Sequence, residues 1–194
     1  MMNTRNKFDT ARMTLAAALT AIVVVLQFLG QFMRLGPFAI SPVLIPIVIG
    51  AALCGPAIGA WLGLSFSIVV LFTDAGAFLA VSPIGTVLTV LLKGMLAGLA
   101  AGLVYRLIAK KNVYIATLAA AIVCPIVNTG VFLLGCFAFF YETVAEWGRA
   151  LGFEGAVDYM FLGLAGGNFL FELATNIILS PVAVRILRIS KRFR

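Results

Sequence analysis

The chain has 194 residues, of which 63% are hydrophobic and 11% are charged, and its mean hydropathy is +1.14. A soluble domain is about half apolar and about a quarter charged, so this chain has too few charges to cover a water-exposed surface. The composition therefore excludes a soluble domain, a disordered chain and a coiled coil, and it predicts a polytopic membrane protein.

A single all-α membrane domain over residues 1–194 is expected, built as a bundle of six transmembrane helices. The predicted spans are about residues 13–32, 39–53, 57–72, 84–108, 113–140 and 160–187. The second and third spans are short for a simple crossing, and the second contains Pro42 and Pro46. A tilted or irregular pair packed inside the protein is therefore expected, separated by a tight turn at Gly55-Pro56.

The basic residues predict the orientation. Six spans put both termini on one side, together with nearly all Lys and Arg: Arg5, Lys7, Arg12, Arg106, Lys110, Lys111, Arg185, Arg188, Lys191, Arg192 and Arg194. The other side has only Arg34 and Arg149, beside the acidic residues Asp74, Glu142, Glu146, Glu154 and Asp158. The positive-inside rule then places both termini in the cytoplasm.

Sequence motifs for catalysis and for metal binding are missing. The chain has no GxxxxGK[ST] segment for ATP, no HExxH, no GxSxG and no histidine, and Cys54, Cys124 and Cys136 form no CxxC pair. The carboxylates of the outer segments are interpreted as solvated loop charges. We therefore expect no enzyme activity, no metal and no cofactor, which leaves transport, binding or channel function.

Small residues recur at four-residue spacing in three spans. They are Ala17 and Ala21 in the first span, Gly55, Gly59 and Gly63 at the third, and Gly94, Gly98 and Gly102 in the fourth. Such stripes let another backbone approach closely. For the glycines, internal packing is the expected use. For the alanines, internal packing and the docking of another subunit remain equally open.

Lys93 and Glu172 are the two full charges deep inside spans. Lys93 lies 106 − 93 = 13 positions before Arg106, and Glu172 lies 185 − 172 = 13 positions before Arg185. Both are therefore about 20 Å from the cytoplasmic boundary. Equal depth and opposite sign make them candidate partners in a structural pair. Alternatively, Lys93 faces a cavity and meets an acidic or carbonyl group of a ligand.

A second polar layer lies nearer the outer side. Asn128 and Asn168 offer amide donors and acceptors that suit a polar ligand, or they bond one helix to another. Asn168, Glu172 and Asn176 share one helix stripe, which should face the interior. Aromatic residues gather at the same end and either close an apolar pocket or form an interfacial belt: Phe78, Phe139, Phe140, Tyr141, Trp147 and Phe153.

In this order, these features resemble the substrate-binding S component of an energy-coupling factor (ECF) transporter. The similar segments are a basic start followed by Ala17-xxx-Ala21, then residues 45–51, Gly55-Pro56 and Gly59, residues 93–102, residues 125–130 and residues 168–172. Each pattern is weak by itself, but their order in a basic chain of this length is specific.

The resemblance implies a monomeric bundle that captures a micronutrient, usually a vitamin, from outside. It implies a transmembrane coupling subunit and two cytoplasmic ATPases as partners, with Ala17 and Ala21 docking on the coupling subunit and the whole S component toppling to deliver its cargo. The implied pocket lies under the loops 34–41, 73–83 and 141–159. Asn128, Asn168, Lys93, Glu172 and Phe78 are its candidate substrate-binding residues.

The substrate is less defined. The thiamine-type branch uses histidine and several tryptophans, whereas this chain has no histidine and only Trp61 and Trp147. The riboflavin-type branch has an acidic stretch where this chain has none, at residues 36–41. Pantothenate suits a cavity with Lys93, because a cation favours its carboxylate. The alternative function is a self-sufficient secondary transporter or facilitator for a small polar solute, with Glu172 and Lys93 as a proton relay.

Overall fold

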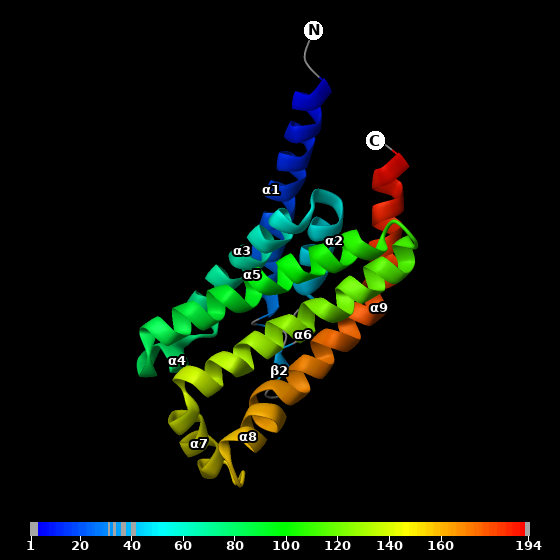
Figure 1. The fold of residues 1–194 in the computed structure, drawn as a ribbon. Coiled ribbons are helices and arrows are strands. Elements are labelled where there is room, and N and C mark those ends of the chain that lie inside the picture. The colour runs from blue at the N-terminus through cyan, green and yellow to red at the C-terminus, as the bar shows by residue number, and fades with distance from the viewer. Residues whose placement is uncertain (1–3, 31, 33, 36–37, 40–41, 193–194) are drawn as a thin grey trace.

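The structure is a computed structural model that describes residues 4–30, 32, 34–35, 38–39 and 42–192. It is almost entirely helical, which confirms the predicted all-α class apart from one two-residue strand pair (Figure 1). The elements are α1 (Thr4–Gly30), β1 (Arg34–Leu35), β2 (Phe38–Ala39), α2 (Leu44–Cys54), α3 (Pro56–Thr73), α4 (Gly76–Val81), α5 (Pro83–Ile108), α6 (Val113–Phe139), α7 (Tyr141–Ala150), α8 (Ala156–Asp158), the π-helix η1 (Tyr159–Gly166) and α9 (Gly167–Arg192).

Helices long and apolar enough to cross a membrane number five in the described part of the chain. They are Thr10–Gly30, Pro56–Thr73, Pro83–Ile108, Val113–Phe139 and Ala156–Ile189. The predicted second span is represented by α2, which has only 11 residues. At 1.5 Å per residue α2 rises about 16 Å, roughly half of the hydrocarbon thickness. A count of six spans therefore stays a prediction.

Helix α2 is short because turn chemistry limits it at both ends. It begins at Leu44, after a turn at Pro42 and Val43, and not at residue 39 as expected, since β2 holds Phe38–Ala39. It ends at Gly55, whose φ of 98° is in the region that favours glycine, and Pro56 then begins α3. The predicted Gly55-Pro56 turn is thus confirmed.

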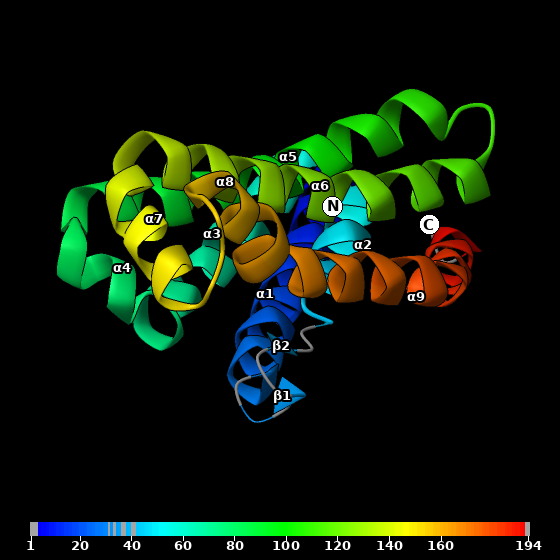
Figure 2. The same ribbon diagram turned by 90° about the horizontal axis from the view of Figure 1, so that it is seen from below.

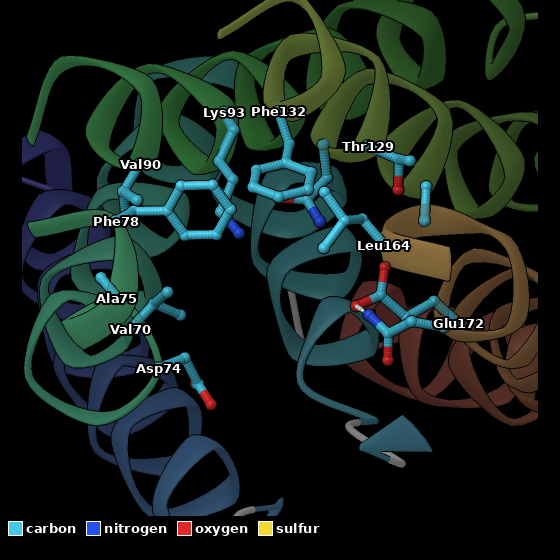
Figure 3. Close-up of a pocket in the computed structure, with 13 residues that line it drawn as sticks. Val70, Asp74, Ala75, Phe78, Val90, Lys93, Thr129, Phe132, Leu164 and Glu172 are labelled. Carbon is cyan, nitrogen blue, oxygen red and sulfur yellow. Dashed lines mark hydrogen bonds between the residues drawn. The ribbon is translucent and has the colours of Figure 1, made fainter. Parts of the chain in front are cut away.

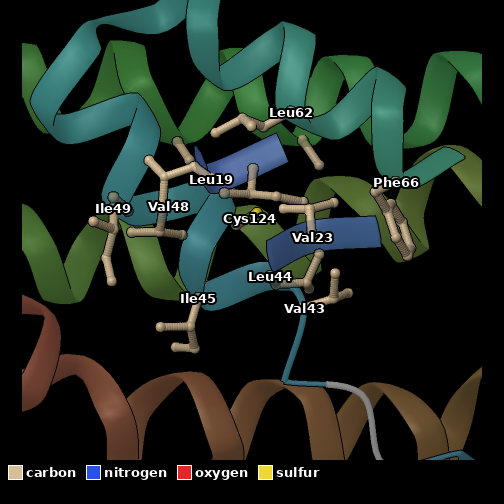
Figure 4. Close-up of a cluster of buried hydrophobic side chains, with 14 of the residues drawn as sticks. Leu19, Val23, Val43, Leu44, Ile45, Val48, Ile49, Leu62, Phe66 and Cys124 are labelled. Atoms are coloured by element: carbon tan, nitrogen blue, oxygen red, sulfur yellow. The ribbon is translucent and has the colours of Figure 1, made fainter. Parts of the chain in front are cut away.

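The centre of the hydrophobic core is α2 itself. Its side chains are nearly all buried between α1, α3, α5, α6 and α9. Figure 4 shows Leu44 and Val48 of α2 beside Val23 of α1 and Leu62 of α3. An apolar helix that is buried on all sides needs no contact with lipid, which agrees with the expectation of an irregular element inside the protein.

Helices α3 and α5 approach each other through their glycines. A Cβ at Gly63 would overlap the carbonyl of Gly94, a Cβ at Gly98 would overlap the carbonyl of Gly59, and a Cβ at Gly102 would lie 2.6 Å from Cα of Pro56. Backbone therefore faces backbone along the whole contact. The internal packing expected of both glycine stripes is confirmed.

The two ends of the bundle differ. In Figure 1 both termini lie toward one end, and α4, α7 and α8 lie toward the other. Figure 2 shows α4 and α7 together beyond the ends of α5 and α6. Two segments predicted as loops, 73–83 and 141–159, therefore contain the helices α4 and α7.

Ser82 accepts a hydrogen bond from the backbone N–H of Gly85 at 3.3 Å. This hydrogen bond caps the N-terminus of α5, directly after α4.

Because α3 and α5 touch at their glycines, adding one methyl group at such a contact should destabilise the protein, and adding it elsewhere should not. Gly63→Ala should lower the free energy of unfolding by about 1–3 kcal/mol, because α3 and α5 must separate to admit it. The measurement is thermal unfolding of the detergent-purified protein. Gly130→Ala on α6 is the matched control, since a Cβ there meets nothing within 4 Å. Equal melting temperatures for both variants would contradict this account of the contact.

Candidate functional site

A cavity of about 180 Å³ lies at the α4 end of the bundle. It is lined by Val70, Asp74, Ala75, Phe78, Val90, Lys93, Asn128, Thr129, Phe132, Leu164, Ala165, Asn168 and Glu172 (Figure 3). Four long helices, η1 and α4 thus contribute to one site. The set contains all five residues that the sequence proposed for substrate binding. The structure therefore brings them together, and their role in binding remains a proposal.

Lys93 supplies the cation of the cavity. It lies in α5 directly before Gly94, on the side of the helix that faces α3. Its Nζ lies 5.3 Å from the ring centroid of Phe132 and 5.8 Å from that of Phe66. Both distances are within the range of cation–π attraction. Lys93 makes no ion pair with any carboxylate that the structure describes, so the direct pair with Glu172 expected from equal depth does not form. Instead, both residues face the same cavity.

Glu172 and the two asparagines supply the polar wall on α6 and α9. Asn168 Nδ2 donates a hydrogen bond to Glu172 Oε1 at 3.4 Å. The second carboxylate oxygen, Oε2, is buried and has no hydrogen-bond partner among the residues that the structure describes, and the same holds for Oδ1 of Asn128 and Oδ1 of Asn168. The stripe from Asn168 to Asn176 faces the interior as predicted, but Asn176 is buried in the core and does not line the cavity.

The π-helix η1 positions the part of this polar wall that lies on α9. It runs directly into α9, so its wider turn sets the direction in which Asn168 and Glu172 project. Glycines permit the local geometry, because a Cβ at Gly163 would overlap the ring of Tyr159 and a Cβ at Gly166 would lie 2.7 Å from the carbonyl oxygen of Phe161. A π-helix was not anticipated, since apolar periodicity does not separate it from an α-helix.

Phe78 of α4 closes one side of the cavity, where several aromatic rings gather. Its ring makes edge contacts with Phe132 at 5.8 Å, Phe140 at 5.1 Å and Trp147 at 5.3 Å between centroids. These contacts join α4, α6 and α7 into one cover. The other predicted aromatics lie elsewhere: Phe139 and Tyr141 are exposed, and Phe153 packs on Tyr159.

Sequence reasoning missed several cavity residues, and Asp74 is the most informative. It is exposed, as expected of a solvated charge, and it also lines the cavity, where its Oδ2 accepts hydrogen bonds from Gln27 Nε2 and Thr73 Oγ1, each at 3.0 Å. The sequence did contain one signal for this contact, because Gln27 is a polar residue within an apolar span. The structure buries Gln27 in α1. Phe132 and Leu164 carried no signal, because they lie in continuous apolar runs.

The alanine stripe of α1 faces outward. Ala17 and Ala21 are exposed, and they share that face with exposed Ile22 and Val25. The opposite face of α1 packs against α2 and α3 through Leu19 and Val23. Internal packing is therefore not the use of Ala17 and Ala21 within this chain. Of the predicted pocket loops, residues 34–41 fall largely outside the described residues.

Comparison with known proteins gives one family match. The family described as "ECF transporter, substrate-specific component" matches residues 11–187. No curated protein and no solved structure matches the chain. The family match extends over nearly all of the residues that form the helices and the cavity, and the helices are those of a multi-pass membrane protein. The chain therefore belongs to the family of ECF transporter substrate-specific components.

Proposed function

We propose that this S component captures a small vitamin-like micronutrient outside the cell for ATP-driven uptake. A coupling subunit in the membrane and two cytoplasmic ATPases would supply the energy. One observation carries the proposal: a cavity with a buried carboxylate, one buried and one half-buried amide and a lysine lies at the end of the bundle opposite the termini. With both termini cytoplasmic, as the basic residues predict, that cavity opens toward the outside.

The substrate we propose is a small carboxylate, with pantothenate as the first candidate. Lys93 is a donor without an ion-pair partner among the described carboxylates, so its Nζ is available to a ligand carboxylate. Phe78, Phe132 and Leu164 offer apolar surface to an aliphatic body. A cavity of about 180 Å³ limits the occupant to a small molecule.

The face of α1 around Ala17 and Ala21 is the proposed docking surface for the coupling subunit. Small exposed side chains let another helix approach closely in lipid, where packing drives association. The same helix reaches the cavity on its buried side, where Gln27 hydrogen-bonds to Asp74. The docking surface and the proposed substrate site therefore lie on opposite faces of one element.

Ligand binding is tested by thermal shift of the detergent-purified chain against a vitamin panel, since a ligand of the folded state raises Tm. We expect Asn128→Ala to weaken the binding of the stabilising vitamin by about 1–3 kcal/mol, through loss of a buried hydrogen bond. Ser180→Ala on α9, outside the cavity, is the control. Unchanged affinity in Asn128→Ala would remove this residue from the site.

Docking is tested by Ala17→Trp and Ala21→Trp. In cells that contain the ATPases and the coupling subunit, we expect each variant to block vitamin uptake, because a bulky side chain prevents close helix approach. Vitamin affinity of the purified variants should stay unchanged. Ile186→Trp places the same bulk on an exposed position of α9 and should leave uptake intact. Equal loss of uptake and affinity would show a structural role for the stripe.

Dependence on partners is tested with the chain alone in liposomes. We expect binding of the vitamin but no concentrative uptake, since the sequence has no ATP-binding motif. Uphill accumulation without partner or nucleotide would favour the secondary-transporter alternative.

A further inference from the structure

Three acceptor oxygens on residues that line the cavity have no donor among the described residues. They are Oδ1 of Asn128, Oδ1 of Asn168 and Oε2 of Glu172, and no described residue donates a hydrogen bond to any of them. The side chains of Asn128 and Glu172 are only 5% and 7% exposed. Buried polar atoms in folded proteins are nearly always paired, so acceptors gathered at a cavity wall call for donors from the occupant.

The hydrogen bond between the two α9 side chains defines which atoms are acceptors. Because Asn168 Nδ2 donates to Glu172 Oε1, its Oδ1 is the atom left without a partner among the described residues. An ionised carboxylate has no donor of its own, so Oε2 of Glu172 can only accept. As these side chains are placed, none of the three oxygens has a hydrogen-bond partner among the described residues. We call Asn128, Asn168 and Glu172 the acceptor cluster.

The cation of the cavity comes from a different wall. Lys93 projects from α5 and is held by the rings of Phe66 and Phe132. Figure 3 shows Lys93 and Glu172 on different sides of the cavity, with Phe132 and Leu164 along its wall. The cavity thus has a cationic side and an acceptor side, with apolar wall beside both. The two lining carboxylates, Glu172 and Asp74, would both repel a ligand carboxylate, so its place is beside Lys93, the one cation among the described lining residues.

Resting on the proposed function, we propose a substrate class for this site: a small carboxylate whose opposite end carries two or three O–H or N–H donors. The carboxylate pairs with Lys93, and the hydroxyl, amide or ureido donors bind the acceptor cluster. An acid without such donors leaves Oε2 of Glu172 and both amide oxygens unpaired in the complex. The acceptor cluster therefore determines specificity, and Lys93 alone does not.

The test compares three carboxylates on the purified full-length chain by titration calorimetry. Pantothenate carries two hydroxyls and an amide N–H, biotin carries two ureido N–H groups, and nicotinate carries a carboxylate without such donors. We expect pantothenate or biotin to bind, and nicotinate to bind at least about tenfold more weakly, because it offers no hydrogen bond to the acceptor cluster.

Variants assign the effect to the acceptor cluster. Glu172→Gln should weaken the bound donor-bearing acid by about tenfold to hundredfold, since an amide group replaces part of the acceptor surface with a donor. Asn168→Ala should weaken it in the same direction, and it keeps the test decisive if Glu172→Gln does not fold. Asn176→Ala is the matched control, because Asn176 is on the same stripe but does not line the cavity.

Three results would overturn the inference: nicotinate binding as tightly as the donor-bearing acids, unchanged affinity in the folded cluster variants, or no binding of either donor-bearing acid. In the last case the proposed function is judged separately. A Tm increase with riboflavin or thiamine would retain vitamin capture while rejecting the substrate class. No stabilisation by any vitamin would reject both.

Discussion

Contact of backbone with backbone between α3 and α5 is the constraint on which the cavity depends. Gly59 and Gly63 meet Gly98 and Gly94 without intervening side chains. Lys93 directly precedes Gly94, and Phe66 lies one turn after Gly63, so the close approach brings the lysine and its aromatic neighbour together. In lipid no hydrophobic force holds helices together, and tight packing of this kind supplies the association energy.

The cavity combines groups that a purely structural core would pair or exclude. A lysine without a described ion-pair partner, a carboxylate oxygen without a donor and two unpaired amide oxygens line one small volume. Leaving such groups unsatisfied costs stability, of the order of 1–3 kcal/mol for each. This arrangement is unfavourable for folding alone, and it supports the proposal that a polar ligand completes the site.

Helix α1 connects the interior with the outer surface of the bundle. Its buried face packs on α2 and α3 and ends with Gln27, which hydrogen-bonds to Asp74 at the cavity. Its other face exposes Ala17 and Ala21. For a subunit whose family works with a separate energising module, a helix that has both a cavity contact and a free small-residue face is suited to the proposed division of labour.

The depth of a residue and the stripe on which it lies are properties of one helix at a time, so the sequence determined them well. Hydropathy predicted the long helices, glycine spacing predicted close internal packing of the two stripes, and counting residues along each span brought Lys93, Asn128, Asn168 and Glu172 to compatible depths. Tertiary structure alone decided how the helices turn toward one another, because residue counting gives height along an axis but no rotation about it. For that reason the Lys93–Glu172 pair was expected but does not form, and Phe132, Leu164 and Asp74 joined the cavity unforeseen. The π-helix η1 and the helices α4 and α7 likewise depend on contacts between distant segments, such as Phe78 with Trp147.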